Sequence, residues 1–462
     1  MSTLVAGVDT STQSVKIVIR DAHTGRLVRQ GKASHPEGTE VDPGAWWDAL
    51  QSAIKEAGGL EDVAALAVGG QQHGMVLLDK DGNVIRKALL WNDTRSAPQA
   101  DALNKEFPDM AERTGSALVA SFTASKVRWV AENEPENAAK IAAICLPHDY
   151  ISWKLTGSTN INDLFTDRSD ASGTGYFNPV TSTYDKELLA AALKSNRTIV
   201  LPRIITSKDF GGTAPSGTKI GAGAGDNAGA GFGIQARKGD IVVSLGTSGT
   251  AFAVSSTSTH DTSGTIAGFA DVTGNFLPLV CTLNAARILD AATKILGVNH
   301  DKLGELALKA PAGAGGLALL PYFEGERTPN RPDATGHLSG LTLSNSNPEY
   351  IARAFVEGML CGLADAVDSL DKSGVEIKRV FLVGGAAKNP AVGEIASALF
   401  GREVLIPEPG EYVANGAARQ AAWALLGGDS APEWDLGEVT SIQATPTPEV
   451  LTNYRKLRDL TD

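Results

Sequence analysis

The sequence is poor in cysteine, and its few cysteines are not arranged for structural chemistry. Cys145, Cys281 and Cys361 lie far apart, and none of them belongs to a C-x-x-C pair. Three separated cysteines fit neither a disulfide framework nor a zinc site, and they suit a reducing compartment. We therefore expect a cytoplasmic protein without structural disulfides.

Long apolar runs and an excess of basic residues are also missing. No stretch approaches the ~20 apolar residues that a membrane-spanning helix requires, and the opening MSTLVAGVDT lacks the basic and apolar regions of a secretory signal. The net charge is −12, so there is no basic stripe to neutralise nucleic-acid phosphates. We expect neither a membrane nor a nucleic acid as partner. A small anionic ligand stays compatible, because backbone N–H groups can hold phosphate without lysines.

What the chain does contain is enough apolar sequence for more than one core. It has 462 residues, of which 42% are hydrophobic and 20% charged. That length and composition predict a globular protein of two or three domains.

Two halves of the chain show the same order of expected elements. Residues 4–21 read as a β-hairpin, followed by a helix from Asp42 or Pro43 to Gly58 and a buried strand, VAALAVGG. In the second half, GDIVVSLGTSGTAFAVSS is again strand, turn and strand, with a helix over 348–374 and the strand RVFLVGG after it. We predict two related α/β domains, 1–235 and 236–462, with the last ~35 residues as a C-terminal extension.

The glycine-rich stretch KIGAGAGDNAGAGFG, residues 219–233, allows three interpretations. It contains G-x-G-x-x-A, but a dinucleotide loop needs a strand directly before it and an acidic residue about 20 positions later, and both are missing. A flexible linker is the second interpretation. The third is a helix of small residues with Asp226 as its N-cap, which would project a carboxylate into a site.

Three small-residue turns could hold phosphate groups. DTSTQS and GTSGT join strands in matching places of the two halves, and FLVGGAAKNP ends a strand in two glycines. Each turn alone is more often an ordinary hairpin turn. The two matching turns, DTSTQS and GTSGT, could together hold a nucleotide triphosphate between domains.

Seven segments carry a family resemblance: GVDTSTQSVKIVI, GQQHG, LWNDTR, GDNAGAGFG, SLGTSGT, LPYFEGERTPN and FLVGGAAKNP. In this order they resemble the FGGY carbohydrate kinases, over about residues 4–425. The resemblance implies an α/β fold of two duplicated actin/hexokinase-like (ribonuclease H-like) ATPase domains with an interdomain cleft. Within the family, DPGAWW, WND and GDN look like the xylulokinases. One departure is Gln72, which stands where those members often have methionine.

The resemblance implies an ATP-dependent kinase that phosphorylates D-xylulose at the 5-hydroxyl, with ATP and Mg²⁺ required. Another substrate of the family, such as ribulose, gluconate or a related polyol, is the alternative. The same ATPase fold also serves filament subunits and chaperone switches, but those lack the sugar-loop histidine and the GDN aspartate. A homodimer is expected from family habit.

Residue roles follow by matching positions. Asp226 is expected as the general base and Asp9 as a mainly water-mediated Mg²⁺ ligand, because a base at Asp9 would be too far from the sugar. The expected sugar-binding residues are Gln72, His73, Asn227 and Trp91. The expected nucleotide-binding residues are Thr10, Ser11, Thr12, Thr247, Ser248, Gly249, Gly384, Gly385 and Asn389.

Overall fold

The computed structural model describes residues 3–461, which form two compact units that are each assembled from separate parts of the chain. The first unit comprises Met1–Ala236, Ser256–Leu277 and Glu411–Asp435. The second comprises Arg237–Ser255, Pro278–Gly410 and Leu436–Asp462.

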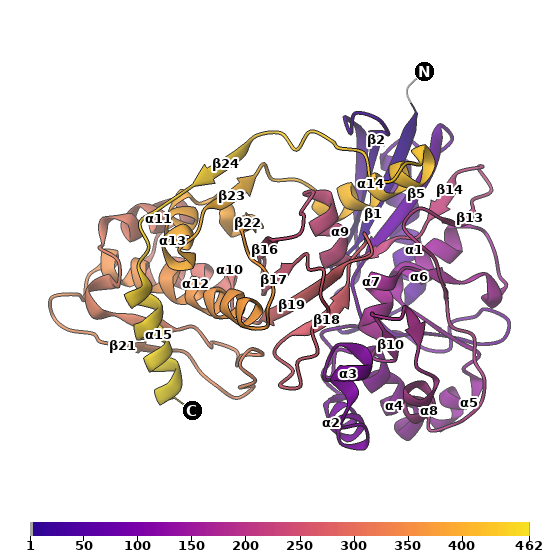
Figure 1. The fold of residues 1–462 in the computed structure, drawn as a ribbon, viewed down its shortest axis with the longest axis horizontal. Helices are drawn as coiled ribbons and strands as arrows, with labels where there is room; N and C mark the ends of the chain where they lie inside the picture. Colours follow the sequence, from indigo (N-terminus) through magenta and orange to yellow (C-terminus); the bar gives the residue numbers. More distant parts are fainter. Residues whose placement is uncertain (1–2, 462) are drawn as a thin grey trace. The chain divides into compact units, whose positions relative to one another are not determined.

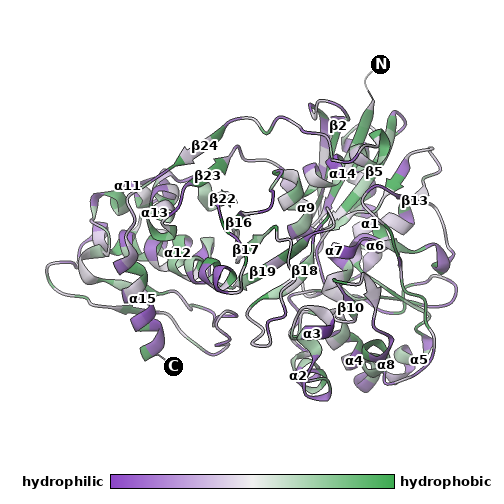
Figure 2. Ribbon diagram, in the orientation of Figure 1, coloured by the Kyte–Doolittle hydropathy of each residue, from purple (hydrophilic) through white to green (hydrophobic). Residues whose placement is uncertain are grey.

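The first unit is built on a mixed sheet in the order β13-β14-β5-β1-β2-β3, with β15 also paired to β5. All seven residues of the first strand are buried, as expected of an apolar strand covered on both faces, and the β5 strand is largely green in Figure 2. β1 pairs antiparallel with β2 and parallel with β5. The strands are β1 (Leu4–Thr10), β2 (Ser14–Asp21), β3 (Leu27–Ser34), β5 (Val63–Gly70), β13 (Phe210–Thr213), β14 (Lys219–Gly221) and β15 (Ala224–Gly225).

Ten helices belong to this unit within the described residues, and the last of them comes from far along the chain. They are α1 (Pro43–Glu56), α2 (Ala97–Glu106), α3 (Met110–Thr114), α4 (Thr123–Asn133), α5 (Pro135–Lys140), α6 (Pro147–Leu155), α7 (Arg168–Ala171), α8 (Lys186–Leu193), α9 (Asp226–Gly233) and α14 (Tyr412–Leu426). In Figure 1, the yellow α14 lies against the indigo strands β1 and β5.

The second unit repeats the strand-turn-strand start. Its strands run in the order β19-β17-β16-β22-β23-β24, with β16 antiparallel to β17 and parallel to β22. The strands are β16 (Asp240–Leu245), β17 (Gly249–Ala253), β19 (Phe276–Thr282), β22 (Arg379–Val383), β23 (Val404–Pro407) and β24 (Val439–Ile442). The helices are α10 (Ala286–Leu296), α11 (His300–Lys309), α12 (Pro348–Lys372), α13 (Pro390–Phe400) and α15 (Pro448–Leu460).

The local elements expected from the sequence are confirmed. The hairpin is β1 and β2, the apolar strand VAALAVGG is β5, and the first helix is α1. The Asp42 side chain caps α1 by accepting a hydrogen bond of 2.8 Å from the Gly44 backbone N–H. The linker interpretation of residues 219–233 is wrong, because this stretch forms β14, β15 and α9.

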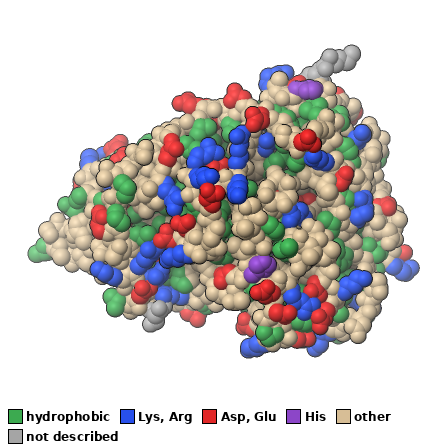
Figure 3. Space-filling view, viewed as in Figure 1, with side chains coloured by type: hydrophobic (Ala, Val, Ile, Leu, Met, Phe, Trp, Pro, Cys, Tyr) green, Lys and Arg blue, Asp and Glu red, His purple; other side chains and the backbone are tan. Residues whose placement is uncertain are grey.

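No helix within the described part of the chain is long and apolar enough to cross a bilayer. The three cysteines are free thiols. On the face drawn in Figure 3, acidic and basic side chains are interspersed.

The helix α14 packs so closely on its neighbours that three glycines leave no room for a side chain. A Cβ at Gly7 of β1 would overlap the Ala414 carbonyl oxygen, and a Cβ at Gly233 of α9 would overlap that of Tyr412. In α14 itself, a Cβ at Gly416 would overlap the Gly229 carbonyl oxygen. These contacts are backbone to backbone, so a rotamer change cannot relieve them.

We expect Gly416→Ala to lower the free energy of unfolding by about 1–3 kcal/mol or more, because the added methyl forces α14 away from α9. Urea unfolding measures the change. The control is Gly362→Ala in α12, where the nearest atom to a new Cβ is the Tyr454 hydroxyl at 3.7 Å. Gly362→Ala should leave the free energy of unfolding unchanged or raise it slightly, because alanine favours the helix more than glycine and the position has space for a methyl group. Equal effects of the two substitutions would contradict the close packing.

Candidate active site

The carboxylate of Asp9 lies near the end of β1 and is buried. Its Oδ1 has no hydrogen-bond partner among the described residues. Lys16 stands opposite Asp9 in the β1–β2 register, with its Nζ 2.6 Å from Glu411 Oε2. Burial raises the pKa of Asp9 to about 7, Lys16 opposes this rise, and Asp226 adds to it. A buried carboxylate oxygen without a partner is suited to a cation.

Asp226 is the first residue within α9, whereas the sequence predicted it as the N-cap, the residue before the helix. The N-cap of this helix is Gly225, so the predicted N-cap role of Asp226 is wrong. Instead, its Oδ1 accepts hydrogen bonds from the backbone N–H and the side-chain Nδ2 of Asn227, at 2.7 and 2.8 Å. Burial raises the pKa of Asp226 to about 6. Asp9 and the residue before Asp226 both lie beside the end of β5, because Asp9 pairs with Gly69 and Gly225 pairs with Gly70.

The loop after β5 brings Gln72 to the glycine directly before Asp226. Gln72 is buried, and its Nε2 donates to the Ser169 carbonyl at 3.2 Å. A Cβ at Gly225 would lie 2.7 Å from that same Nε2. The glycine therefore makes space for Gln72, and two stretches predicted to take part in one site are in direct contact.

His73 has an unusual backbone conformation that the fold holds in place. Its φ is +68°, a region that costs a residue with a side chain on the order of 1 kcal/mol. Its carbonyl accepts hydrogen bonds from Thr123 Oγ1 at 3.1 Å and Lys126 Nζ at 3.0 Å. Its Nδ1–H donates to the Gly173 carbonyl at 2.8 Å, and its ring packs on Phe122 with centroids 4.8 Å apart. The ring orientation is thus fixed.

The first small-residue turn and Trp91 are joined directly. The Trp91 Nε1–H donates to Thr12 Oγ1 at 2.8 Å, while Ser11 accepts from His35 Nδ1 through its carbonyl at 2.8 Å. Thr10 Oγ1 is buried and has no partner in the described residues. Trp91 is half-buried and lies beside this turn.

In the second unit, the other two turns meet at one end of the sheet. Gly384 follows β22 with φ +103°, and a Cβ there would lie 2.5 Å from the Leu245 carbonyl oxygen at the end of β16. The turn with Thr247, Ser248 and Gly249 begins directly after that strand. Thr247 is exposed, and Gly385 faces open space. Exposed backbone at two neighbouring strand ends is suited to phosphate.

Asn389 has its side chain engaged within the protein. Its Oδ1 accepts from the Ala391 N–H at 3.0 Å as the N-cap of α13, and its Nδ2 donates to the His300 carbonyl at 2.8 Å. Its predicted role beside the nucleotide stays a prediction.

Two lysines of the first unit, Lys126 and Lys16, were not among the predicted site residues. Lys126 is completely buried, and desolvation lowers its pKa to about 7. Nothing around it in the sequence distinguishes it from a surface lysine of a helix. Lys16 could have been found, because it lies opposite Asp9 in the predicted hairpin.

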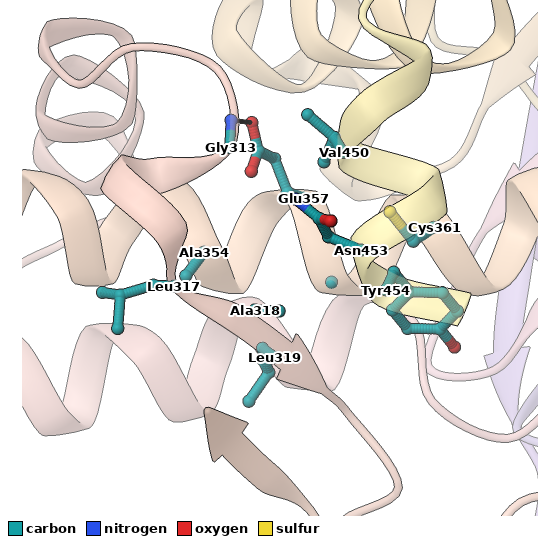
Figure 4. A pocket seen from close by; sticks show the side chains of 11 residues that line it. Gly313, Leu317, Ala318, Leu319, Ala354, Glu357, Cys361, Val450, Asn453 and Tyr454 are labelled. Carbon is teal, nitrogen blue, oxygen red and sulfur yellow. Dashed lines mark hydrogen bonds between the residues drawn. The ribbon is translucent and has the colours of Figure 1, made fainter. Parts of the chain in front are cut away.

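A small cavity in the second unit does not compete as a site. It lies between α12 and α15, lined by Glu357, Cys361 and Tyr454 among others, and has a volume of about 10 Å³ (Figure 4). That is room for a single water.

Models of two protein domains match the chain. The N-terminal domain of the FGGY family of carbohydrate kinases matches residues 4–232, and the C-terminal domain of that family matches residues 241–425. The chain belongs to the FGGY family of carbohydrate kinases. It is therefore an ATP-dependent sugar kinase, and its fold is that of the actin/hexokinase-like ATPases, as the sequence predicted.

Individual members of the FGGY family are similar over nearly the whole chain. A xylulose kinase from Streptomyces coelicolor is 42% identical over 97% of this chain and 94% of its own. The crystal structure of a xylulose kinase from Bifidobacterium adolescentis has a TM-score of 0.92 and 48% identity, covering 99% of both chains. A gluconate kinase from Lactobacillus acidophilus has a TM-score of 0.87 at 25% identity, covering 100% of this chain and 97% of its own.

We expect Asp226→Asn to stabilise this FGGY kinase at pH 8 in metal-free buffer, because it removes a desolvated charge. The pKa of Asp226 is about 6 in the fold against an ordinary 3.8, so the native state binds more protons than the unfolded state between these values. The wild type thus loses stability as pH rises through this window. The variant's gain in free energy of unfolding should be large at pH 8 and vanish near pH 4.

Asp101→Asn, at an exposed position of α2, is the matched control and should show no such difference. A gain for Asp226→Asn that is equal at both pH values would show that burial does not raise this pKa.

Proposed function

We propose that the enzyme transfers the γ-phosphoryl group of ATP to the 5-hydroxyl of D-xylulose. The observation that carries the proposal is the contact of Gln72 with Gly225, which joins the sugar loop to the backbone that bears Asp226. The similarity to xylulose kinases from Streptomyces coelicolor and Bifidobacterium adolescentis supports the choice of sugar.

Asp226 is the general base of the proposed reaction. Phosphoryl transfer needs a carboxylate that receives the hydroxyl proton as the new O–P bond forms, while the bond between the γ-phosphorus and the ADP oxygen breaks. With a pKa of about 6, Asp226 is mostly ionised near neutral pH and ready to accept that proton. Asn227 fixes Oδ1 of the carboxylate through two hydrogen bonds and would contact the sugar in the proposed reaction.

Sugar recognition falls to the loop after β5 and to Trp91. His73 is the proposed sugar ligand of this loop, and its ring orientation is fixed by the hydrogen bond from Nδ1 to the Gly173 carbonyl. Gln72 and Trp91 complete the proposed contacts.

The nucleotide contacts divide between the two units. Thr10, Ser11 and Thr12 would approach the γ-phosphate. In the second unit, Thr247, Ser248 and Gly249 would hold the β- and γ-phosphates, and Gly384, Gly385 and Asn389 the α-phosphate and adenosine. In-line transfer requires both sets to act on one ATP during turnover.

Asp9 would hold Mg²⁺, mainly through water. Its unpartnered, buried Oδ1 fits this role. When bound, the ion neutralises charge on the transferring phosphates. Lys16, paired with Glu411, is the cationic side chain that stands opposite Asp9.

Another FGGY substrate is the second candidate, and the likeness to a gluconate kinase favours keeping it. We expect D-xylulose to give the highest kcat/KM in a panel of D-xylulose, ribulose, gluconate, pentitols and glycerol, measured by coupled ADP release. A higher kcat/KM with any other compound would transfer the assignment to that compound. No turnover with any of them would reject a kinase for these substrates.

We expect Asp226→Ala to lower kcat by about 10²–10⁴-fold, the usual contribution of a general base, and to leave ATP affinity within about twofold. Turnover and calorimetric titration with a non-hydrolysable ATP analogue measure the two quantities. Asp101→Asn serves as the control for surface charge and should retain full kcat. Survival of turnover in Asp226→Ala would assign the base to another residue.

A further inference from the structure

His148 lies between the sugar loop, which follows β5 and carries Gln72 and His73, and the loop from Ala222 to Gly225 directly before Asp226, here called the catalytic loop. It is the second residue of α6 and is completely buried. A Cβ at Gly70, the last residue of β5, would lie 2.7 Å from His148 Cβ, and a Cβ at Gly223 would overlap the edge of the imidazole ring. A side chain at either position would collide with His148, so both glycines make room for this ring. The sequence analysis assigned no role to His148.

Both ring nitrogens of His148 face acceptors. Nδ1 lies 2.6 Å from Asp170 Oδ2, and Nε2 lies 3.1 Å from the Ala222 carbonyl oxygen. A neutral imidazole has only one N–H, whereas the imidazolium donates from both nitrogens. The contact between Nδ1 and Asp170 Oδ2 has the short length of a charge-assisted hydrogen bond.

Carboxylates surround the ring and favour its charged form. Asp149 Oδ1 lies 3.1 Å from Nδ1, and Asp167 is close enough to act electrostatically. Burial alone would lower the pKa of His148, but Asp149 and Asp170 together raise it to about 10. The cation offsets part of the cost of burying three acidic side chains.

The residue next to Asp170 holds both loops. Ser169 Oγ accepts a hydrogen bond from the Gly225 N–H at 3.1 Å, and the Ser169 carbonyl accepts from Gln72 Nε2 at 3.2 Å. His148 thus reaches the catalytic loop directly through Ala222 and indirectly through α7.

The other side of the catalytic loop is held by α14. Gln420 Oε1 accepts from the Gly223 N–H at 2.8 Å, and its Nε2 donates to the Gly223 carbonyl at 2.7 Å. The loop from Ala222 to Gly225 is therefore fixed from two directions directly before Asp226.

We propose that His148 is a positioning residue which, as an imidazolium between Asp170 and the Ala222 carbonyl, sets the place of Asp226 relative to Gln72. This inference rests on the proposed role of Asp226 as base. The residue touches neither sugar nor nucleotide and acts through the loop it holds.

Two substitutions separate the hydrogen bonds of the ring. In His148→Asn the amide can replace the Nδ1 donor to Asp170 and loses the donor to Ala222. In His148→Gln the longer side chain can reach Ala222. We expect kcat to fall about 10–100-fold in His148→Asn, as for a small misplacement of reacting groups, and to fall clearly less in His148→Gln.

His260→Asn is the matched control, because His260 is in the same unit and its hydrogen bonds lie away from these loops. Its Nδ1–H donates to the Ala111 carbonyl, and its Nε2 pairs with Ser258 Oγ. It should leave kcat within about twofold, the scatter expected of an uninvolved position. If the variants lost activity only through a general loss of stability, their kcat values would follow their unfolding midpoints. In the proposal, kcat instead depends on which hydrogen bond of the ring each variant keeps. Equal kcat values for wild type and His148→Asn would overturn the proposal.

Two measurements need no substrate, so they separate this inference from the proposed function. Amide hydrogen exchange over residues 222–225 should be faster in His148→Asn than in wild type, and unchanged exchange would overturn the inference. In wild-type protein labelled with ¹⁵N-histidine, one of the seven rings should still be doubly protonated at pH 8.5. Seven neutral rings would overturn it, even if neither variant folds. Failure of the sugar panel alone would reject the proposed function and leave these readouts intact.

Discussion

The first unit depends on the backbone contact between α14 and its neighbours β1 and α9. Gly7, Gly233 and Gly416 permit this contact because each lies where a side chain would overlap a carbonyl oxygen. β1 carries Asp9 and α9 begins with Asp226, so one helix supports the elements that bear both carboxylates. The same helix supplies Gln420 to the catalytic loop, and the residue before it, Glu411, pairs with Lys16. Close-packed backbones have little freedom to shift, which suits a reaction sensitive to the spacing of its groups.

The site concentrates negative charge where water is scarce. Asp9 and Asp226 both have raised pKa values because burial disfavours their charged forms. Asp9 lies on β1 and Asp226 directly follows β15, and both strands pair with the end of β5. Removing these charges would raise the stability of the protein but would remove the proposed base and the proposed Mg²⁺ ligand. Such a conflict between stability and activity is common at catalytic sites. Around the neighbouring loops, the cost of burying negative charge is reduced in a different way. There His148 offsets buried carboxylates within the fold, whereas the Asp9 oxygen has no partner among the described residues. The first arrangement gives a fixed scaffold, and the second is suited to an ion that arrives with the nucleotide.

Much of the local structure could be predicted because it is written in short patterns. The hairpin of β1 and β2, the capped start of α1 at Asp42 and the buried strand β5 all follow from apolar runs and turn residues. The position of Asp226 was predicted to within one residue, but its N-cap role was wrong because cap geometry depends on the backbone angles of Gly225. The contact between Gln72 and Gly225 and the burial of Lys126 could not be predicted. Their partners are brought close by tertiary packing, and such contacts produce no repeating pattern of residues in the sequence. The roles of the individual site residues stay predictions.

The chain passes between the two units five times, since each unit is assembled from three segments. A fragment that ends near residue 235 would contain Asp9, the sugar loop and Asp226, yet it would lack α14. The face of the sheet at Gly7 would then have no helix to cover it, and the apolar residues Val5 and Ala67 that pack with α14 would meet water. The sheet that carries Asp9 is therefore fully covered only in the intact polypeptide. A gene encoding only the first half would yield a chain missing the helix on which its own catalytic loop rests.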